Sequence, residues 1–250
     1  MCINTHEYLN VSIRNLYNQL SSVEYNMKTL FIHAKSSVDV KIPDKLLEML
    51  PKQRYGLVTN IQHMHKLRDV QAQLKDSVYG GQVVGCRPDA GLAIENKIDA
   101  FLFVGNGVFH PIQVAVKTNK DVWLWDPTQQ ILKILDSKVV EEYKKKKRIS
   151  FVKFMNAKTV GILISTKVGQ NDNKIASYSK ELKMKKALEL KKRTDKKYYL
   201  FAFDTLLQYD LENFNFIDIW VNTACNRIGD EKPNILEVDD LLEFERTGGI

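Results

Sequence analysis

Four short apolar runs, rich in β-branched residues, form the clearest pattern along the 250-residue chain. They occupy residues 55–61, 99–104, 160–166 and 217–221. The first and third runs are almost wholly apolar and end in polar residues, which is typical of strands buried on both faces of a parallel sheet. The second and fourth form another matching pair further along the chain. The pattern therefore predicts two copies of one α/β unit.

Helical patterns separate these expected strands at residues 65–76, 90–98, 138–147 and about 174–193. Alternation of strands and helices predicts an α/β fold with two repeated parallel-sheet domains and helices on both faces of each sheet. We expect the domains to span residues 51–150 and 151–250. Such sheets bind ligands at the carboxyl ends of their strands, where the loop that contains Cys225 falls.

Composition narrows the class of protein. A hydrophobic content of 44% is enough for extensive cores, and the formal net charge is +7. This charge favours an acidic partner or a nucleic acid but is too small to establish either, and a nucleic acid is the less favoured of the two. No apolar run reaches the roughly 18 residues of a membrane span, and no secretory signal is recognisable. Three cysteines without regular spacing argue against a disulfide framework, so we expect a cytoplasmic protein.

Two of the cysteines lie in loops that border expected strands. Cys86 ends the stretch Gly80-Gly81-Gln82-Val83-Val84-Gly85-Cys86, and Cys225 lies within Trp220-Val221-Asn222-Thr223-Ala224-Cys225-Asn226-Arg227. They are too far apart for a local C-x-x-C site. Such thiols either assemble a metal or cluster site from separate domains or are small buried apolar side chains.

Five segments occur in an order that resembles one known family. They are Asn60–Leu67, Gly81–Cys86, Asp99–Pro111, Ser165–Gln170 and Trp220–Arg227. Together they closely resemble the diphthamide synthase family, the 2-(3-amino-3-carboxypropyl)histidine synthases, and are nearer to its archaeal members. The resemblance implies three similar α/β domains, each contributing one cysteine to a 4Fe–4S cluster that binds S-adenosylmethionine. It further implies transfer of the 3-amino-3-carboxypropyl group to a histidine of elongation factor 2.

By this resemblance, Cys86 and Cys225 are cluster ligands, and residues 1–50 are a remnant of the first domain. Residues 28–40 resemble the last strand and exit loop of that domain, and the first cluster cysteine of the family lies in the part that has no counterpart here. Cys2 is the only other thiol, and its surroundings do not match that motif. The third ligand is left open between Cys2, another substitute ligand and a group supplied by a separate polypeptide.

Three further residues are expected to bind substrate. Arg227 is placed by the resemblance to meet a carboxylate, although it could equally form a surface salt bridge. His110 is expected at the end of a strand, facing a ligand crevice or serving a structural role. Gln170 follows a buried strand, where a turn would present it to an adenosine or carboxylate group. The histidines of Gln62–Leu67 are read as turn residues, not zinc ligands.

Three functions remain open. The first is a catalytic, cluster-holding part of a diphthamide synthase, as a homodimer or in complex with a polypeptide that supplies the first domain. The second is a non-catalytic paralogue or partner subunit that binds elongation factor 2 or the catalytic subunit. The third is a basic RNA-binding module, supported only by net charge and the lysine runs at residues 141–148 and 180–197. No catalytic residue is assigned.

Overall fold

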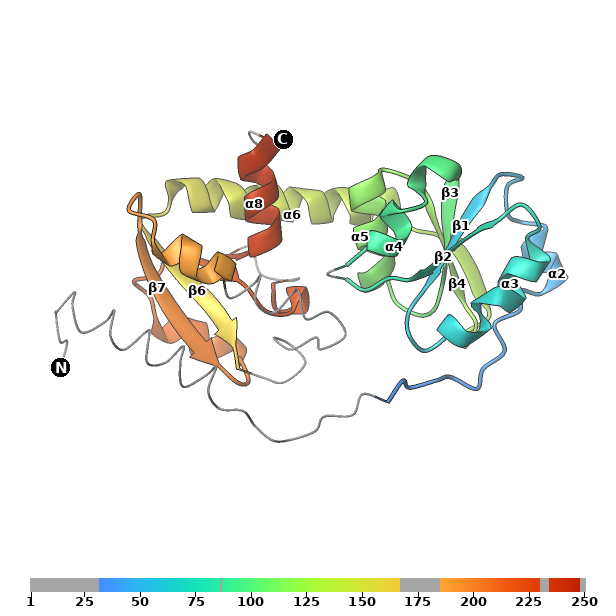
Figure 1. Ribbon diagram of the computed structural model, residues 1–250, viewed down its shortest axis with the longest axis horizontal. Coiled ribbons are helices and arrows are strands. Elements are labelled where there is room, and N and C mark those ends of the chain that lie inside the picture. The colour runs from blue at the N-terminus through green and yellow to red at the C-terminus, as the bar shows by residue number, and fades with distance from the viewer. Residues whose placement is uncertain (1–31, 86, 167–184, 230–233, 248–250) are drawn as a thin grey trace. The chain divides into compact units, whose positions relative to one another are not determined.

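The computed structural model describes residues 32–85, 87–166, 185–229 and 234–247. The chain separates into two compact units, Met1–Ala34 and Lys35–Ile250. All elements described below belong to the second unit, which contains one sheet of five strands and one of four. Helices flank both sheets (Figure 1). The expected α/β class with two parallel-rich sheets is confirmed.

The first sheet has the strand order β2-β1-β3-β4-β5. Its strands are β1 (Tyr55–Thr59), β2 (Val78–Gln82), β3 (Ala100–Val104), β4 (Val122–Asp126) and β5 (Ile131–Ile134). The first four in this order run parallel, and β5 is antiparallel to β4. Every residue of β1 and β3 is buried, as the unbroken apolar patterns of these runs predict.

Helices pack on both faces of this sheet. They are α2 (Asp44–Leu47), η1 (Met64–Lys66), α3 (Leu67–Gln73), α4 (Asp89–Leu92), η2 (Glu95–Lys97), α5 (Phe109–Thr118) and α6 (Ser137–Asn156). One core joins side chains of α3 to Leu57 and Leu102. The opposite core joins side chains of α5 and the first turns of α6 to Phe101 and Phe103.

The second sheet has the order β7-β6-β8-β9, with all strands parallel. Its strands are β6 (Thr159–Ser165), β7 (Lys197–Phe203), β8 (Ile219–Asn222) and β9 (Ile235–Glu237). One face is covered by the end of α6, by a helix that includes residues 185–191 and by α8 (Val238–Thr247). Among the described residues, η4 (Gln208–Asn213) and η5 (Asn226–Ile228) contribute to the other face.

An aspartate at the same position relative to each sheet supports the internal repeat. Asp99 precedes β3, and its carboxylate accepts a hydrogen bond of 2.8 Å from the backbone N–H of Arg54, directly before β1. Asp218 precedes β8, and its carboxylate accepts bonds of 2.8 Å from the backbone N–H groups of Lys158 and Thr159 at the start of β6. The central strands of both sheets are therefore tied at their amino ends by the same device.

Glycines in the central strands provide a second equivalence. Gly56 of β1 is the register partner of Phe101, and Gly161 of β6 is the register partner of Trp220. A Cβ at Gly161 would lie 2.4 Å from two ring carbons of Trp220. At Gly161, only a residue without a side chain leaves room for the neighbouring ring. Phe101 and Trp220 thus occupy equivalent positions in the two sheets.

Several boundaries differ from the sequence prediction. Gly80, Gly81 and Gln82 belong to β2, so the loop that leads to Cys86 begins only at Val83. The helix expected at 138–147 continues to Asn156, and the helical pattern at 90–98 is split into α4 and η2.

The predicted remnant at residues 1–50 is described only from residue 32. Residues 32–43 form neither helix nor strand, and the segment 28–31 lies outside the described residues. The expected boundary between residues 150 and 151 falls within α6. The domain boundaries stay a prediction.

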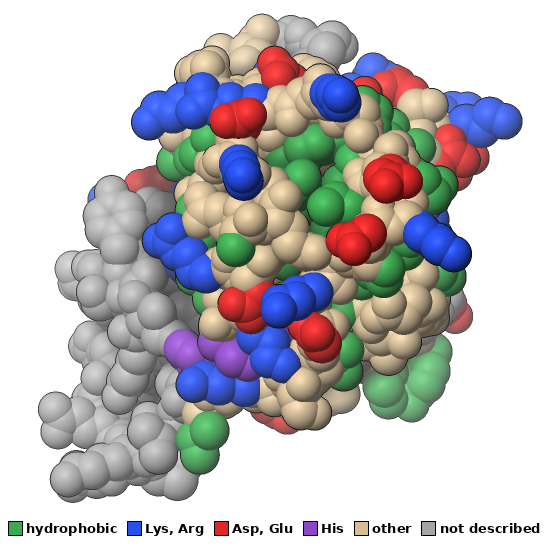
Figure 2. All heavy atoms as spheres, turned by 90° about the vertical axis from the view of Figure 1, so that its right-hand side faces the viewer, with side chains coloured by type: hydrophobic (Ala, Val, Ile, Leu, Met, Phe, Trp, Pro, Cys, Tyr) green, Lys and Arg blue, Asp and Glu red, His purple; other side chains and the backbone are tan. Residues whose placement is uncertain are grey.

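Positive and negative side chains are mixed on the face of the molecule drawn in Figure 2. On the face drawn in Figure 2, lysine and arginine side chains alternate with aspartate and glutamate. The net charge of +7 therefore forms no continuous basic field on this face. No helix in the described part of the chain is both long enough and apolar enough to cross a bilayer.

Candidate functional site

Three loops at the carboxyl ends of the strands meet on one aromatic ring, that of Phe109. Gly85 lies in the loop after β2, Phe109 begins α5 after β3, and Arg227 lies in η5 after β8. A Cβ on Gly85 would lie 2.2 Å from the Phe109 ring, so the ring fills the space that a side chain would need. The guanidinium carbon of Arg227 lies 5.1 Å from the centroid of the same ring. The neighbour of Cys86 and a near neighbour of Cys225 thus contact one side chain.

Stacking on Phe109 gives Arg227 a defined position although its side chain is exposed. A guanidinium over an aromatic face gains about 0.5–1 kcal/mol at an exposed site. It also keeps its planar N–H edge for a bidentate partner such as a carboxylate. The expected role of Arg227 in meeting a carboxylate is compatible with this arrangement.

His110 lies beside the same ring. Its imidazole packs edge-on to Phe109 with ring centroids 5.1 Å apart, and its Nδ1 is buried without a hydrogen-bond partner among the described residues. Burial, and next the positive charge of Arg227, lower the pKa of His110. The imidazole is therefore neutral at pH 7 and can accept a hydrogen bond at Nδ1 if the proton is on Nε2.

The expected place of His110 at a strand end is wrong. Strand β3 stops at Val104, and His110 is the second residue of α5. Pro111 explains the difference, because proline is well tolerated in the first turn of a helix, where its missing N–H leaves no intrahelical bond unmade. The prediction that His110 lies near the ligand-binding edge of the sheet does not depend on this correction.

Cys225 is a free, half-buried cysteine at the N-cap position of η5. The strand before it ends in Asn222, whose side chain is fully buried. The Asn222 carboxamide oxygen accepts a hydrogen bond of 2.9 Å from the N–H of Ala224, and its Nδ2 donates one of 2.9 Å to the carbonyl of Cys225. One side chain therefore fixes the turn that presents the thiol.

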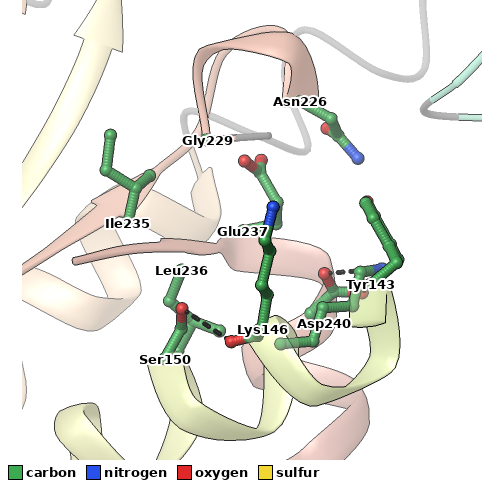
Figure 3. Close-up of a pocket in the computed structure, with 10 residues that line it drawn as sticks. Tyr143, Lys146, Ser150, Asn226, Gly229, Ile235, Leu236, Glu237 and Asp240 are labelled. Carbon is green, nitrogen blue, oxygen red and sulfur yellow. Dashed lines mark hydrogen bonds and ion pairs between the residues drawn. The ribbon is translucent and has the colours of Figure 1, made fainter. Parts of the chain in front are cut away.

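Behind this turn lies a small cavity of about 30 Å³. Its walls come from α6, the η5 turn, β9 and α8, and are formed by Tyr143, Lys146, Lys147, Ser150, Asn226, Gly229, Ile235, Leu236, Glu237 and Asp240. In Figure 3, Glu237 points toward the turn of Gly229, and Lys146 extends its amino group toward Glu237. The cavity has room for about one water molecule. It is thus a packing feature beneath the Cys225 loop and too small for a substrate.

The histidines after β1 lie in a turn, as predicted. His63 precedes η1 and is only 4% exposed. Burial, together with the charges of His65 and Lys66, lowers the pKa of His63. No cluster of three His, Cys, Asp or Glu side chains suited to a metal ion occurs among the described residues.

Comparison with known proteins identifies the family. Residues 17–233 match the model of the family described as "Putative diphthamide synthesis protein". This range covers most of the chain. The chain belongs to the diphthamide synthesis family.

Two archaeal members of the diphthamide synthesis family illustrate the relationship. A protein of Methanocaldococcus jannaschii named 2-(3-amino-3-carboxypropyl)histidine synthase is 25% identical over 223 residues, which are 85% of this chain and 59% of that protein. A protein of the same name from Pyrococcus horikoshii is 26% identical over 216 residues, with 80% and 59% covered. The chain therefore spans about three fifths of the length of the curated relatives that it matches.

Solved structures from this family share the fold. The crystal structure of Dph2 from P. horikoshii with a 4Fe-4S cluster matches with a TM-score of 0.65 at 22% identity, covering 85% of this chain and 64% of that chain. A second crystal structure of the same protein gives a TM-score of 0.64 at 23% identity, with 83% and 62% covered. At this level of identity the likeness concerns the fold.

The predicted site residues of this family member divide into two groups. Cys225, Arg227 and His110 are described: Arg227 and His110 lie against Phe109, and Cys225 precedes Arg227 by two residues at the start of the same turn. Cys86, Gln170 and Cys2 lie outside the described residues. The assignment of each as a ligand or substrate contact stays a prediction.

Two residues of the site escaped the sequence analysis. Phe109 lies within the matched segment Asp99–Pro111 but carries no chemistry that would single it out. Asn222 does carry a signal in the sequence, because a polar residue that ends an apolar, buried strand needs a specific hydrogen-bond partner.

Proposed function

We propose that this chain is the cluster-holding part of an enzyme that transfers the 3-amino-3-carboxypropyl group from S-adenosylmethionine to a histidine of elongation factor 2. This transfer is the first step of diphthamide biosynthesis. The observation that carries the proposal is the meeting of the Gly85 loop and the Arg227 loop on Phe109, because it draws together the two segments that hold Cys86 and Cys225. The names of the archaeal relatives support the identity of the transferred group.

The residues present suit an iron–sulfur cluster in their donor chemistry. Such clusters are bound through cysteine thiolates, and a cluster with three protein ligands keeps one iron for a substrate. Cys225 is a free thiol on a turn fixed by buried hydrogen bonds, and Gly85, adjacent to Cys86, brings no side chain to the site. Cys86 and Cys225 would supply two thiolates. A separate first-domain polypeptide or a substitute ligand would supply the third.

The chemistry supplied by such a group is one-electron reduction of the sulfonium, which breaks the bond between sulfur and the γ-carbon. The residues of this chain would bind and orient the substrate. Arg227, held over Phe109, would bind the carboxylate of the amino-acid end through paired N–H groups. This anchoring would select the γ-carbon over the adenosyl carbon by fixing which of them approaches the reducing centre.

His110 and Gln170 would complete substrate binding. His110 is neutral at pH 7 because burial and the charge of Arg227 lower its pKa, so its buried Nδ1 can accept a hydrogen bond from a bound amino group. Gln170 would contact the adenosine or a carboxylate. We expect both roles to appear as a raised KM in alanine variants, with a smaller effect on kcat.

Elongation factor 2 is the proposed macromolecular substrate, and the cytoplasm is the expected compartment. The chain would act as a homodimer or with a polypeptide that supplies the first domain. Because one wall of the S-adenosylmethionine pocket would come from that domain, activity is expected to increase when such a polypeptide is added.

Iron analysis tests the first part of this proposal. The protein is purified without oxygen, reconstituted with iron and sulfide, and assayed for both elements. Cys86→Ala and Cys225→Ala are each expected to lose most of the bound iron, whereas Cys2→Ala should retain it. A wild-type protein that stays colourless and iron-free after reconstitution would refute the proposal. Equal iron loss from Cys2→Ala would assign the third ligand to Cys2.

Product analysis tests the second part. The reduced protein is incubated with S-adenosylmethionine and elongation factor 2, with and without a first-domain polypeptide. We expect methylthioadenosine and a modified histidine. Formation of 5′-deoxyadenosine would contradict the proposed bond cleavage. A stable cluster without turnover in either mixture would favour the non-catalytic partner subunit.

A further inference from the structure

The turn that presents Cys225 is tied to a buried carboxylate on the neighbouring strand. Asn222 of β8 and Glu237 of β9 are register partners in adjacent parallel strands. Asn222 is fully buried and Glu237 is 8% exposed. The Nδ2 of Asn222 lies 2.9 Å and 3.1 Å from the two carboxylate oxygens of Glu237. The same amide nitrogen donates to the carbonyl of Cys225, so a continuous set of hydrogen bonds joins Glu237 to the cysteine.

Close packing holds this carboxylate in place. A Cβ on Gly229 would lie 2.5 Å from a carboxylate oxygen of Glu237, so the chain after η5 passes directly over it. Figure 3 shows Glu237 between the Gly229 turn and the side chain of Lys146 from α6. Glu237 is therefore closely packed on the side of the turn.

The position of Asn222 and Glu237 has an equivalent in the first sheet, and there the fold does not require a polar pair. Phe101 and Trp220 are equivalent, since both oppose the glycine of the preceding central strand. Two residues further along, the register partners in the first sheet are Phe103 and Leu124. The equivalent partners in the second sheet are Asn222 and Glu237.

An apolar pair thus fills the same structural position in the first repeat of the chain. Burying an amide and a carboxylate costs free energy that an apolar pair does not, and replacing such pairs by apolar residues is often neutral or stabilising. The polar pair is consequently better explained by the loop that it holds than by the stability of the sheet.

We propose that Asn222 and Glu237 are positioning residues, which hold the Cys225 turn in the conformation in which the thiol can serve as a ligand. Asn222 makes the direct contacts with the turn, and Glu237 orients the Asn222 amide so that its nitrogen faces the Cys225 carbonyl. This inference rests on the proposed function for its purpose. The restraint on the Cys225 turn can be measured without any cluster.

An exchange of the two side-chain types isolates the contact with the cysteine. The double variant Asn222→Asp, Glu237→Gln keeps the size, net charge and mutual hydrogen bond of the pair. The aspartate introduced on β8 still accepts from Ala224 but cannot donate to Cys225. A second double variant, Asn222→Val, Glu237→Leu, copies the apolar character of the Phe103–Leu124 pair. Asp218→Asn is the matched control, because it removes the charge that strengthens the hydrogen bonds at the opposite end of the same strand.

The first readout is alkylation of the metal-free 250-residue chain by iodoacetamide, with each cysteine followed by peptide mass spectrometry. Cys2 serves as the internal reference. In both double variants we expect the ratio of the alkylation rates of Cys225 and Cys2 to rise about threefold or more, because the turn around Cys225 opens more often. Asp218→Asn should leave this ratio unchanged. Urea unfolding, measured in parallel, separates a local change from general loss of stability.

The second readout is the bound cluster. After reconstitution, we expect the double variants to release iron to a chelator faster than the wild type and the Asp218→Asn control, and to show an altered electron paramagnetic resonance signal when reduced. Unchanged Cys225 alkylation in either double variant that remains folded would overturn the inference. If the wild-type protein takes up no iron, the proposed function fails. The alkylation result then still decides whether Asn222 and Glu237 restrain the Cys225 turn.

Discussion

A methyl group added at Gly85 should disturb the site more than the fold. Gly85 is buried beside Cys86, and a Cβ there would lie 2.2 Å and 2.3 Å from two carbons of the Phe109 ring. Ordinary contact between such atoms is about 3.4 Å or more, so the ring must move by roughly 1 Å. Its movement is opposed by the stacked Arg227 and by the edge-on contact with His110. We therefore predict that Gly85→Ala displaces all three loops.

The change in the free energy of unfolding in Gly85→Ala is the sum of two opposing contributions. Overpacking of a well-packed site costs about 1–3 kcal/mol. Replacing glycine by alanine returns about 0.4–1 kcal/mol by restricting the unfolded chain. We expect the free energy of unfolding to fall by about 1–2 kcal/mol in Gly85→Ala. The fold survives a loss of this size, so the loss of iron can be measured on folded protein.

The matched control is Gly56→Ala in the same sheet. A Cβ at Gly56 would meet the terminal methyl groups of Ile98 at 2.6 Å and Ile94 at 2.9 Å, which are the far ends of flexible side chains, and a ring carbon of Phe101 at 3.1 Å, which needs a shift of only a few tenths of an ångström. Its cost in stability should be smaller, and it lies in β1, outside the loops at the carboxyl ends of the strands. We expect Gly56→Ala to keep the iron content of the wild type, and Gly85→Ala to lose at least half of it.

A compensating change sharpens the assay. Phe109→Leu shortens the side chain that Gly85→Ala would contact, so the double variant should recover most of the lost unfolding free energy in urea titrations followed by circular dichroism. Iron content is measured on the same samples. If Gly85→Ala matches the wild type in both unfolding free energy and bound iron, the contact with Phe109 does not organise the site and the reasoning is refuted.

Three other predictions concern pH, packing and binding. Hydrogen bonds from Thr159 and Lys158 lower the pKa of Asp218 below its usual 3.8. The ionised carboxylate therefore stabilises the folded state above that pH, and this stabilisation is lost as the pH falls through the pKa of the folded state. In urea titrations, Asp218→Asn should flatten the decline of the unfolding free energy below about pH 4. Trp125→Phe should lower the free energy of unfolding by about 1–3 kcal/mol, because the indole donates a buried 2.7 Å bond to the Val40 carbonyl; an unchanged value would exclude a structural role for this bond. The 250-residue chain, which spans 59% of the length of its archaeal relatives, should bind S-adenosylmethionine weakly at best in calorimetry, and tight binding would show that this chain holds the whole pocket.

The strands of the repeat were predictable because their physical signal is local. Unbroken apolar runs such as those at β1 and β3 can be buried only on both faces, which is the condition of a central parallel strand. Strand β2 gave no such signal. It contains two adjacent glycines, one with φ of +104°, and its register with β1 shifts between Leu57 and Val58. Glycine is depleted in strands, so the pattern favoured a loop there.

The site was predictable only in part. The matched segments identified Arg227 and His110, and both lie at Phe109. The contact between Gly85 and Phe109 depends on how two crossovers pack, and nothing in the local sequence of either residue encodes it. The placement of His110 in a helix followed from Pro111, whose preference for a first helical turn was outweighed in the sequence by the preceding strand pattern.

Helix α6 has a consequence for how the protein opens. Its first turns contribute Val139, Val140 and Tyr143 to a core of the first sheet, and its end contributes Phe151 and Phe154 to a core of the second. Twenty residues of continuous helix thus belong to both hydrophobic cores. Unfolding of either half would leave one end of the helix, with its apolar side chains, without a sheet to pack on, so the two halves are expected to unfold as one cooperative unit. In native-state hydrogen exchange, the central amides of α6 should therefore exchange only through global unfolding, at the same free energy as the amides of β1 and β6.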